Sequence, residues 1–306
     1  MRIASIILNF NSENDLRVCV NQIISQKGVH LVTIIVDNAS RPESMEKVCS
    51  FLKQRQPKLV AGSMDQIMSW VECNNLRAQE SGNIYFVKNS KNLGYSAGNN
   101  IGIRLAEKLK MDAVLIVNPD VRIEDENYLR ELARNLFANE KSCVAASRII
   151  GLDGRDQNPL REISFWEELF WVVGAVRKPS FIFACPVDRA SVVPKVSGCC
   201  LMLKMSFLKK IYYLDENVFL YCEEPILSAK VKSEQGNILY VPQLAAQHAH
   251  KASEKGRTSI RMRQFIKSRR YYLHTYSDYN SIQKCLLNMS YAVLGFICFL
   301  LGGLGR

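Results

Sequence analysis

The sequence predicts an α/β fold in which a doubly wound, mostly parallel sheet fills the first half of the chain. Short apolar runs rich in β-branched residues alternate with segments of helical character over residues 1–150. A strand, a helix and a second strand in succession favour a parallel pair. With 306 residues, 48% of them hydrophobic, the chain is long enough to bury a large core.

The elements follow from these patterns in chain order. Apolar runs predict strands at residues 3–8, 32–36, 84–87 and 113–117, and amphipathic or cap-initiated segments predict helices at 13–26, 44–54, 101–109 and 127–139. Residues 55–82 are poorly patterned, which predicts a loop with a short helix near 67–76. Residues 89–100 are rich in turn formers. Beyond Gly151 the pattern loosens, and we expect a helix at 165–173 and strands at 192–203 and 238–241.

The run from Val114 to Val117 breaks abruptly into a polar corner. Pro119 cannot continue a strand ladder, so the carboxylate of Asp120 is expected just beyond the carboxyl end of the strand. Ligands of open α/β sheets bind at that edge. Taken alone, the sequence Asn118-Pro119-Asp120 is more typical of a simple turn.

Charge and cysteine content narrow the class of protein. The formal charge of +11 points to an anionic partner: a nucleoside diphosphate, a lipid head group or nucleic acid. No recognised nucleic-acid-binding module accompanies the charge, which argues against nucleic acid. The N-terminus shows no secretory signal, and none of the ten cysteines forms a C-x-x-C pair. We therefore expect a reducing compartment and cysteines that fill the core.

The last part of the chain is basic and then uncharged. Residues 251–272 carry eight cations against Glu254 alone, and residues 285–305 carry no charge. The basic part would fold over a donor diphosphate, bind anionic lipid or a polyprenyl pyrophosphate, or form a solvated helix. The uncharged part would insert in or lie on a bilayer, or pack on the protein. Nearby tyrosines suit a membrane interface or sugar stacking; they are Tyr271, Tyr272, Tyr276 and Tyr279.

Several motifs occur in an order that resembles a known family. They are Ile7 to Ser12, Val36 to Ser40, Asn92 to Asn100, Asn118 to Asp120, Val196 to Gly198, Phe219 to Glu224, and His248. Over residues 3–253 this set resembles the family 2 glycosyltransferases of the GT-A fold, in the rhamnosyltransferase-like branch. The resemblance implies a GT-A domain over residues 1–253, with a nucleotide-sugar half (1–150) and an acceptor half (151–253). A basic, then hydrophobic, membrane-associating tail follows at 254–306.

The resemblance implies that a divalent cation, Mg²⁺ or Mn²⁺, is held by Asp120 and His248 against the donor diphosphate. His250, two residues further on, is the alternative to His248. The family's fuller motif has two acidic residues flanking one residue, and here the first of these positions is Asn118. Its amide is still able to hydrogen-bond a ribose or phosphate.

The resemblance also implies the nucleotide contacts. Asp37 matches the acidic residue that meets the base, with a strand-end turn as the alternative. The remaining nucleotide-sugar contacts would come from two motifs: Asn9 and Phe10 from the first, and Asn92, Gly94, Asn99 and Asn100 from the glycine-containing segment. The alternative for Asn99 and Asn100 is that they cap the following helix.

Catalysis is assigned to Glu224, the second member of the acidic pair Glu223-Glu224, as the base that activates the acceptor hydroxyl. The family often has aspartate there and a second aspartate two residues later, where this chain has Ile226. An exposed acidic pair opening a helix at Pro225 is the alternative.

The resemblance implies an inverting, metal-dependent glycosyltransferase that works on the cytoplasmic face of the cell membrane. The donor would be a nucleoside diphosphate sugar, with dTDP-rhamnose the first guess, and the acceptor a surface glycan or a polyprenyl-linked glycan. A non-catalytic nucleotide- or glycan-binding protein with a degenerate site is the alternative, because Asn118 and Ile226 replace expected acids.

Overall fold

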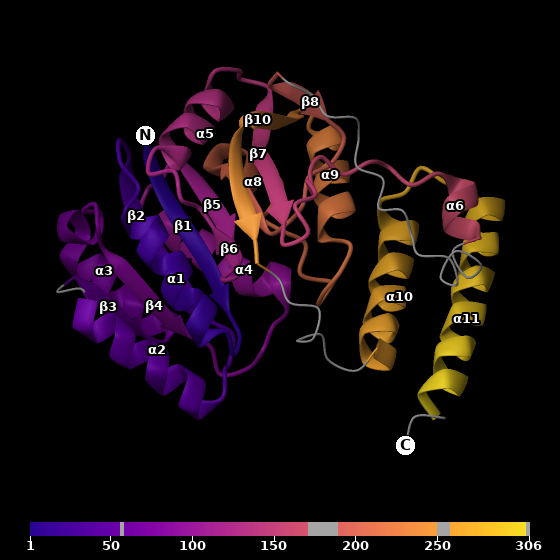
Figure 1. Cartoon of the computed structure of the whole chain (residues 1–306), viewed down its shortest axis with the longest axis horizontal. Helices are drawn as coiled ribbons and strands as arrows, with labels where there is room; N and C mark the ends of the chain where they lie inside the picture. The colour runs from indigo at the N-terminus through magenta and orange to yellow at the C-terminus, as the bar shows by residue number, and fades with distance from the viewer. Residues whose placement is uncertain (56–57, 171–188, 250–257, 304–306) are drawn as a thin grey trace.

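The computed structural model describes residues 1–55, 58–170, 189–249 and 258–303, which form one mixed sheet covered by helices and a helical hairpin beside it (Figure 1). The sheet is ten-stranded, in the order β3-β4-β2-β1-β5-β9-β7-β10-β6, with β8 paired to β10 off this path. Most neighbours are parallel; β9, β6 and β8 run against theirs. The predicted mostly parallel α/β sheet is confirmed.

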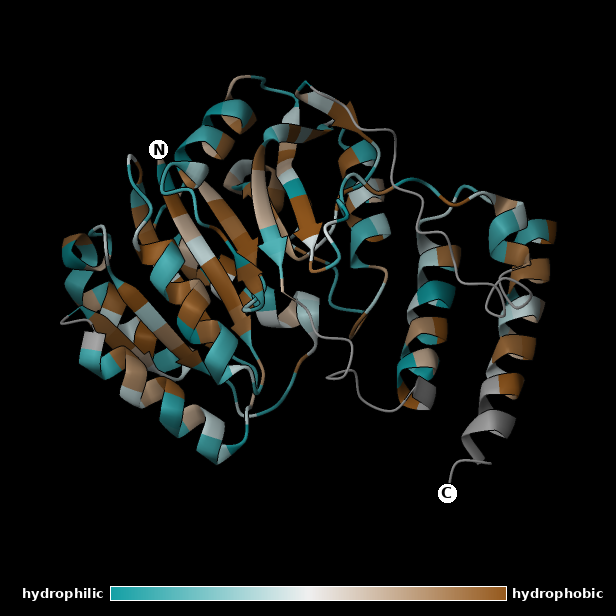
Figure 2. Cartoon of the chain, in the orientation of Figure 1, coloured by the Kyte–Doolittle hydropathy of each residue, from teal (hydrophilic) through white to brown (hydrophobic). Residues whose placement is uncertain are grey.

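The strands begin and end as follows: β1 Arg2–Asn9, β2 His30–Asp37, β3 Leu59–Gly62, β4 Ile84–Lys88, β5 Ala113–Val117, β6 Val121–Arg122, β7 Ser142–Gly151, β8 Ser191–Val193, β9 Cys200–Lys204 and β10 Asn237–His248. The central strands β1, β2 and β5 are almost entirely buried, which matches their unbroken apolar runs. Figure 2 shows these strands mainly in brown, the hydrophobic end of the scale.

The helices cover both faces of the sheet, as a doubly wound fold requires. They are α1 Glu13–Ile24, α2 Pro42–Arg55, α3 Met64–Ala78, α4 Tyr95–Lys108, α5 Tyr128–Phe137, α6 Phe165–Leu169, α8 Met205–Lys210, α9 Glu223–Ser233, α10 Thr258–Thr275 and α11 Ser281–Gly303. Helices α1, α2 and α5 share one apolar core with the sheet, whereas α3, α4, α8 and α9 share the other.

Three expectations for the elements are wrong in detail. The expected loop at 55–82 contains an edge strand, β3, whose four residues are too short and too exposed to give a pattern. Helix α4 begins at Tyr95, well before residue 101, because Gly94 turns the chain at a φ of 84°. The expected strand at 192–203 is two strands, β8 and β9, separated by a loop. Strand β7 was not anticipated at all.

Helices α10 and α11 form an antiparallel hairpin outside the sheet (Figure 1). Its own small core contains Ile266, Leu273, Leu287, Tyr291 and Leu294. A buried ion pair ties it to the domain, since the Arg269 guanidinium donates to both Glu168 oxygens at 2.5 and 2.7 Å. Among the described residues, no helix is both long and apolar enough to cross a bilayer. Residues 171–173 of the helix expected at 165–173, and His250, lie outside the described residues.

Candidate active site

Sheet topology brings Asp120 and His248 together from distant parts of the sequence. Strand β6 follows Asp120 directly and pairs with the end of β10, so that Val121 faces His248 in the ladder. The His248 Nε2 lies 3.4 Å from the Asp120 Oδ2. On the other side of the ring, the His248 Nδ1 lies 2.9 Å from the Gln157 Oε1. We call Asp120, Gln157 and His248 the outer corner.

The chemistry of the outer corner fits a divalent cation. A carbonyl oxygen such as the Gln157 Oε1 only accepts, so the neutral imidazole carries its proton on Nδ1 and keeps a lone pair on Nε2. That lone pair faces the Asp120 carboxylate. Nowhere in the described ranges do three or more His, Cys, Asp or Glu side chains gather as a metal site. Two protein ligands suit Mg²⁺, which usually completes its shell with water and substrate phosphate.

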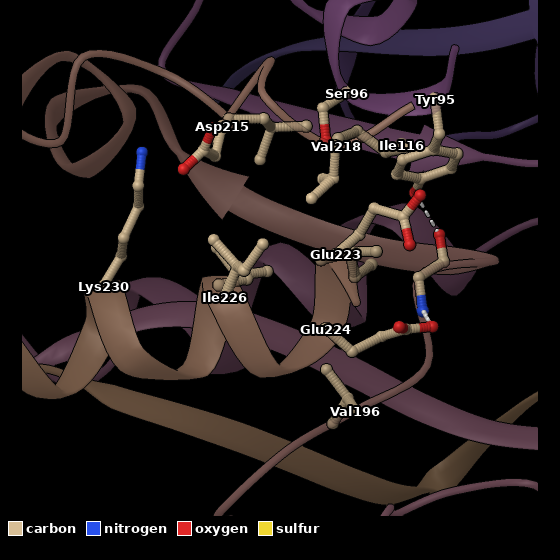
Figure 3. A pocket seen from close by; sticks show the side chains of 14 residues that line it. Tyr95, Ser96, Ile116, Val196, Asp215, Val218, Glu223, Glu224, Ile226 and Lys230 are labelled. Carbon is tan, nitrogen blue, oxygen red and sulfur yellow. Dashed lines mark hydrogen bonds between the residues drawn. The ribbon is translucent and has the colours of Figure 1, made fainter. Parts of the chain in front are cut away.

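A strained turn presents the acidic pair at the start of α9. Tyr221 and Cys222 both have left-handed backbones, at φ of 71° and 68°, a conformation that costs non-glycine residues free energy. Immediately after this turn, the Glu224 Oε1 accepts a hydrogen bond from the Gly198 N–H at 3.3 Å. The Gly198 carbonyl accepts a second one, from the Tyr95 hydroxyl at 2.5 Å (Figure 3). Gly198 therefore links Tyr95 to the proposed base.

Glu223 points the other way, toward Tyr95 (Figure 3). Burial, followed by the nearby charge of Glu224, raises the pKa of the Glu223 carboxyl well above its ordinary value of 4.5. Its Oε1 is buried and has no hydrogen-bond partner among the described residues. Burial likewise raises the pKa of the Tyr95 hydroxyl, and both glutamate charges add to this shift. The interior member of the pair is thus held neutral more readily than a free glutamate.

One open cavity of about 980 Å³ connects these features. Its lining includes Asn118, Lys195, Glu224, His248 and Arg269. Burial lowers the pKa of the Lys195 ammonium, and the charge of Glu224 opposes that shift. Lys195 makes no hydrogen bond through its ammonium and no ion pair with any residue that the structure describes. Its cation therefore faces the cavity beside the acidic pair.

The predicted nucleotide contacts Asn9 and Asp37 lie at a second corner, where they bond to each other. The Asn9 amide donates to the Asp37 Oδ2 at 2.8 Å, and the Ser40 N–H donates to the Asp37 Oδ1 at 2.9 Å. Asn9 and Asp37 are fully buried. We call Asn9, Asp37 and Ser40 the inner corner. Its contacts agree with the strand-end turn that was the alternative for Asp37, whereas Phe10 beside it is about half exposed, at 48%.

The polar groups of the glycine-containing segment, Asn92 to Asn100, also form hydrogen bonds within the protein. The Asn92 side-chain oxygen accepts from the Gly94 N–H at 2.9 Å. A Cβ on Gly94 would come within 2.2 Å of the Phe219 carbonyl oxygen, so glycine permits a close approach to the loop before the acidic pair. Asn99 and Asn100 are buried within α4. The Asn100 amide donates to the Leu214 carbonyl at 2.9 Å, and Gly94 rather than either asparagine caps the helix.

Four residues that the geometry places at the site were not singled out as site residues. Tyr95 and Gly198 lie inside motifs that carried the resemblance, and Lys195 directly precedes the second of these. Gln157 had no sequence signal, because it reaches His248 across 91 positions. Asn118 is placed by the adjoining strand, since its N–H donates to the Cys199 carbonyl at 2.8 Å.

The sequence model of "Glycosyl transferase family 2" matches residues 62–212, which include β5, the outer-corner Asp120 and Gly198. The match spans just under half of the chain and supports a family 2 glycosyltransferase. It is also 30% identical over 158 residues to the low-salt glycan biosynthesis hexosyltransferase Agl10 of Haloferax volcanii. That alignment covers 51% of this chain and 48% of the relative, so the chain matches about half the length of the curated protein.

Solved glycosyltransferase structures share the fold at low sequence identity. TarS residues 1–349 of S. aureus in complex with UDP-GlcNAc align with a TM-score of 0.55 at 15% identity, over 95% of this chain and 72% of that one. The mannosyltransferase PcManGT of Pyrobaculum calidifontis, in complex with GDP-Man and Mn²⁺, aligns with a TM-score of 0.56 at 12% identity, over 100% and 76%. The family 2 domain therefore has the expected GT-A fold.

Proposed function

We propose that this protein is an inverting glycosyltransferase that moves a sugar from a nucleoside diphosphate to an acceptor hydroxyl. The observation that carries the proposal is a single cavity whose lining contains both Glu224 and His248, with Asp120 3.4 Å behind that histidine. A base and a diphosphate-holding corner on one cavity are the two requirements of a direct displacement. The Mn²⁺ and GDP-Man of the mannosyltransferase structure support the donor class and the cation.

In the proposed reaction, the Glu224 carboxylate accepts the proton of the acceptor hydroxyl. The acceptor oxygen bonds to the anomeric carbon while the bond from that carbon to the diphosphate oxygen breaks, and the nucleoside diphosphate leaves. The Gly198 N–H orients the carboxylate, and the Tyr95 hydroxyl fixes Gly198 through its carbonyl. One displacement from the opposite face inverts the anomeric configuration.

Asp120 and His248 would hold the divalent cation, Mg²⁺ or Mn²⁺, which when bound neutralises charge that develops on the leaving diphosphate. Gln157 favours the imidazole tautomer whose Nε2 lone pair points toward Asp120. Asn118, half-buried on the cavity wall, remains a proposed contact to ribose or phosphate. The exposed ring of Phe10 and the loop at Asn92 and Gly94 are proposed to border the nucleotide. The buried residues beneath the nucleotide would support these contacts; they are Asn9, Asp37, Asn99 and Asn100.

Rhamnose from dTDP-rhamnose is the first donor to test, and a surface or polyprenyl-linked glycan is the proposed acceptor. The decisive experiment uses purified full-length protein with Mn²⁺ or Mg²⁺. A thermal-shift panel of nucleotide sugars should identify the donor, since a ligand that binds the native state raises its melting temperature. Transfer is then measured on a panel of glycan and polyprenyl-linked acceptors.

Glu224→Gln should lower kcat by about 10²–10⁴-fold, because the amide accepts no proton, while the donor dissociation constant stays unchanged. Glu46→Gln, at an exposed position of α2, is the matched control and should retain full transfer. The replacement of expected acids by Asn118 and Ile226 keeps a non-catalytic binding protein as the second candidate. Donor binding with equal inactivity of wild type and Glu224→Gln on every acceptor would select it.

A further inference from the structure

Helix α11 exposes a continuous apolar face along the side that turns away from the domain. Ile282, Leu286, Met289, Val293 and Phe296 follow one another at spacings of four and three residues, and their exposed fractions lie between 39% and 73%. The opposite side of the helix, with Leu287, Tyr291 and Leu294, packs in the hairpin core. The exposed residues form a second apolar stripe, which no other described element covers, rather than scattered surface apolar residues.

Two neighbouring helices flank the exposed face. On one side, the Arg270 guanidinium of α10 donates to the Asn288 carbonyl at 3.3 Å. On the other, the Ser290 hydroxyl of α11 donates to the Leu169 carbonyl of α6 at 2.7 Å. The contacts at residues 288 and 290 divide the circumference of the helix into two arcs. The exposed stripe lies in the wider arc, of about 200°, and the residues of the hairpin core lie in the narrower one. In Figure 1, α10 runs alongside α11, and α6 overlaps the upper part of α11, which it contacts.

The flanks carry the residue types of a membrane interface. Arg263 and Lys267 of α10 are exposed, and with Arg270 and His274 they repeat at spacings of four, three and four residues on one side of that helix. Helix α10 contains no acidic residue. On α6, Trp166 and Phe170 are 63% and 57% exposed, and their rings stack at 6.2 Å. Cations and exposed aromatic rings therefore border one apolar stripe.

The same spacing would also suit a seam between two copies of the chain. A coiled-coil seam, however, is normally edged by charged residues that pair across it, and α11 has no charged residue after Lys284. Cations that stand only on the neighbouring helix match an anionic surface better than an identical basic copy.

We infer that α6, α10 and α11 form a platform that docks on an anionic phospholipid bilayer, with α11 lying in the interface and the α10 cations among the head groups. Within the platform, the buried Arg269–Glu168 pair joins α10 to α6, and Arg269 also lines the catalytic cavity. A cavity between α9 and α10, lined by Lys195, Arg269 and Tyr276, shares the first two residues with the catalytic cavity. If the proposed function holds, docking on the bilayer places this cavity beside the membrane, so that a lipid-linked acceptor reaches the catalytic cavity through it.

Vesicle flotation of the full-length protein tests the platform without any transfer assay. Wild type should float with vesicles that contain phosphatidylglycerol and bind pure phosphatidylcholine vesicles about tenfold or more weakly. Met289→Glu/Phe296→Glu should lower binding to the anionic vesicles by about tenfold or more, because it puts two charges on the apolar stripe. Leu76→Glu/Leu152→Glu places the same charges on exposed leucines elsewhere and should bind like wild type.

Arg263→Glu/Lys267→Glu tests the cations independently and should remove the preference for phosphatidylglycerol. Its matched control, Lys53→Glu/Lys141→Glu, makes the same charge change far from the hairpin and should keep that preference. Melting temperatures establish that each variant folds. Equal flotation of wild type and Met289→Glu/Phe296→Glu overturns the inference. Failure of wild type to bind either vesicle type also overturns it. A dimer by light scattering that only this variant dissociates, with unchanged flotation, identifies a seam between copies instead.

Discussion

Asp37 is the last residue of β2 and Asp120 follows β5, both buried strands of the same sheet, yet their carboxylates have different surroundings. Asp37, in the inner corner, is fully buried and accepts from the Asn9 amide and the Ser40 N–H. Asp120, in the outer corner, has a side chain about one-fifth exposed, at 21%, and faces an imidazole nitrogen at 3.4 Å. The inner corner therefore joins the ends of β1 and β2, whereas the outer corner sets a carboxylate against an imidazole, the pair proposed above to hold the cation.

The largest effect that this comparison predicts is on the outer corner. Asp120→Asn should lower Mn²⁺-supported kcat/KM by about 100-fold or more, because an amide oxygen replaces a charged ligand of the cation. The free energy of unfolding should change by less than about 1 kcal/mol, since the side chain is partly solvated. Mn²⁺ titrations of transfer and of binding measure the effect. Unchanged Mn²⁺ dependence would contradict the role given to this corner.

Gln157→Leu supplies a graded version of the same test. Loss of the acceptor at Nδ1 should weaken Mn²⁺ affinity by about 10–100-fold without removing a ligand. Gln54→Leu, on an exposed position of α2, is the control and should leave Mn²⁺ affinity unchanged. Equal Mn²⁺ affinity in both variants would show that the tautomer of His248 does not depend on Gln157.

The inner corner should respond in stability rather than in donor affinity. Asp37→Ala removes the acceptor of the Ser40 N–H and one of the two acceptors of the buried Asn9 amide, which should lower the free energy of unfolding by about 1–3 kcal/mol. Denaturant unfolding measures this loss, and titration with the donor's nucleotide measures affinity. A variant of unchanged stability that binds nucleotide more weakly would instead place the carboxylate against the base.

The smallest effect concerns the acidic pair. A raised folded-state pKa means that Glu223 contributes stability at low pH that is lost as the pH rises above 4.5 and through the raised value. Glu223→Gln remains neutral, so its melting temperature should gain on that of wild type as the pH increases over this interval. Parallel melting-temperature curves for the two proteins would show that Glu223 ionises as freely as in the unfolded chain.

Much of the nucleotide-side half was predictable because its signals are local. Buried parallel strands such as β1 and β5 read as continuous apolar runs, and the polar residues that end them fall at the carboxyl edge of the sheet by geometry alone. Strand β3 escaped prediction because a short edge strand needs no apolar pattern of its own. The predicted start of α4 is six residues too late because its first turns contain Ser96, Asn99 and Asn100, whose burial depends on partners far along the chain.

The sequence alone determined the apolar periodicities, the chain positions of the polar corners and the ordered motifs that resemble family 2 glycosyltransferases. Only tertiary structure decided which groups those polar side chains contact. The Asn100 amide donates to the Leu214 carbonyl, on the loop before α9. The Asp37 carboxylate accepts from the Asn9 amide, because β1 and β2 end side by side. Gln157 and His248 meet because β7 and β10 run side by side, a pairing that no local pattern encodes. Partners that are distant in the sequence thus decide which groups each polar corner contacts.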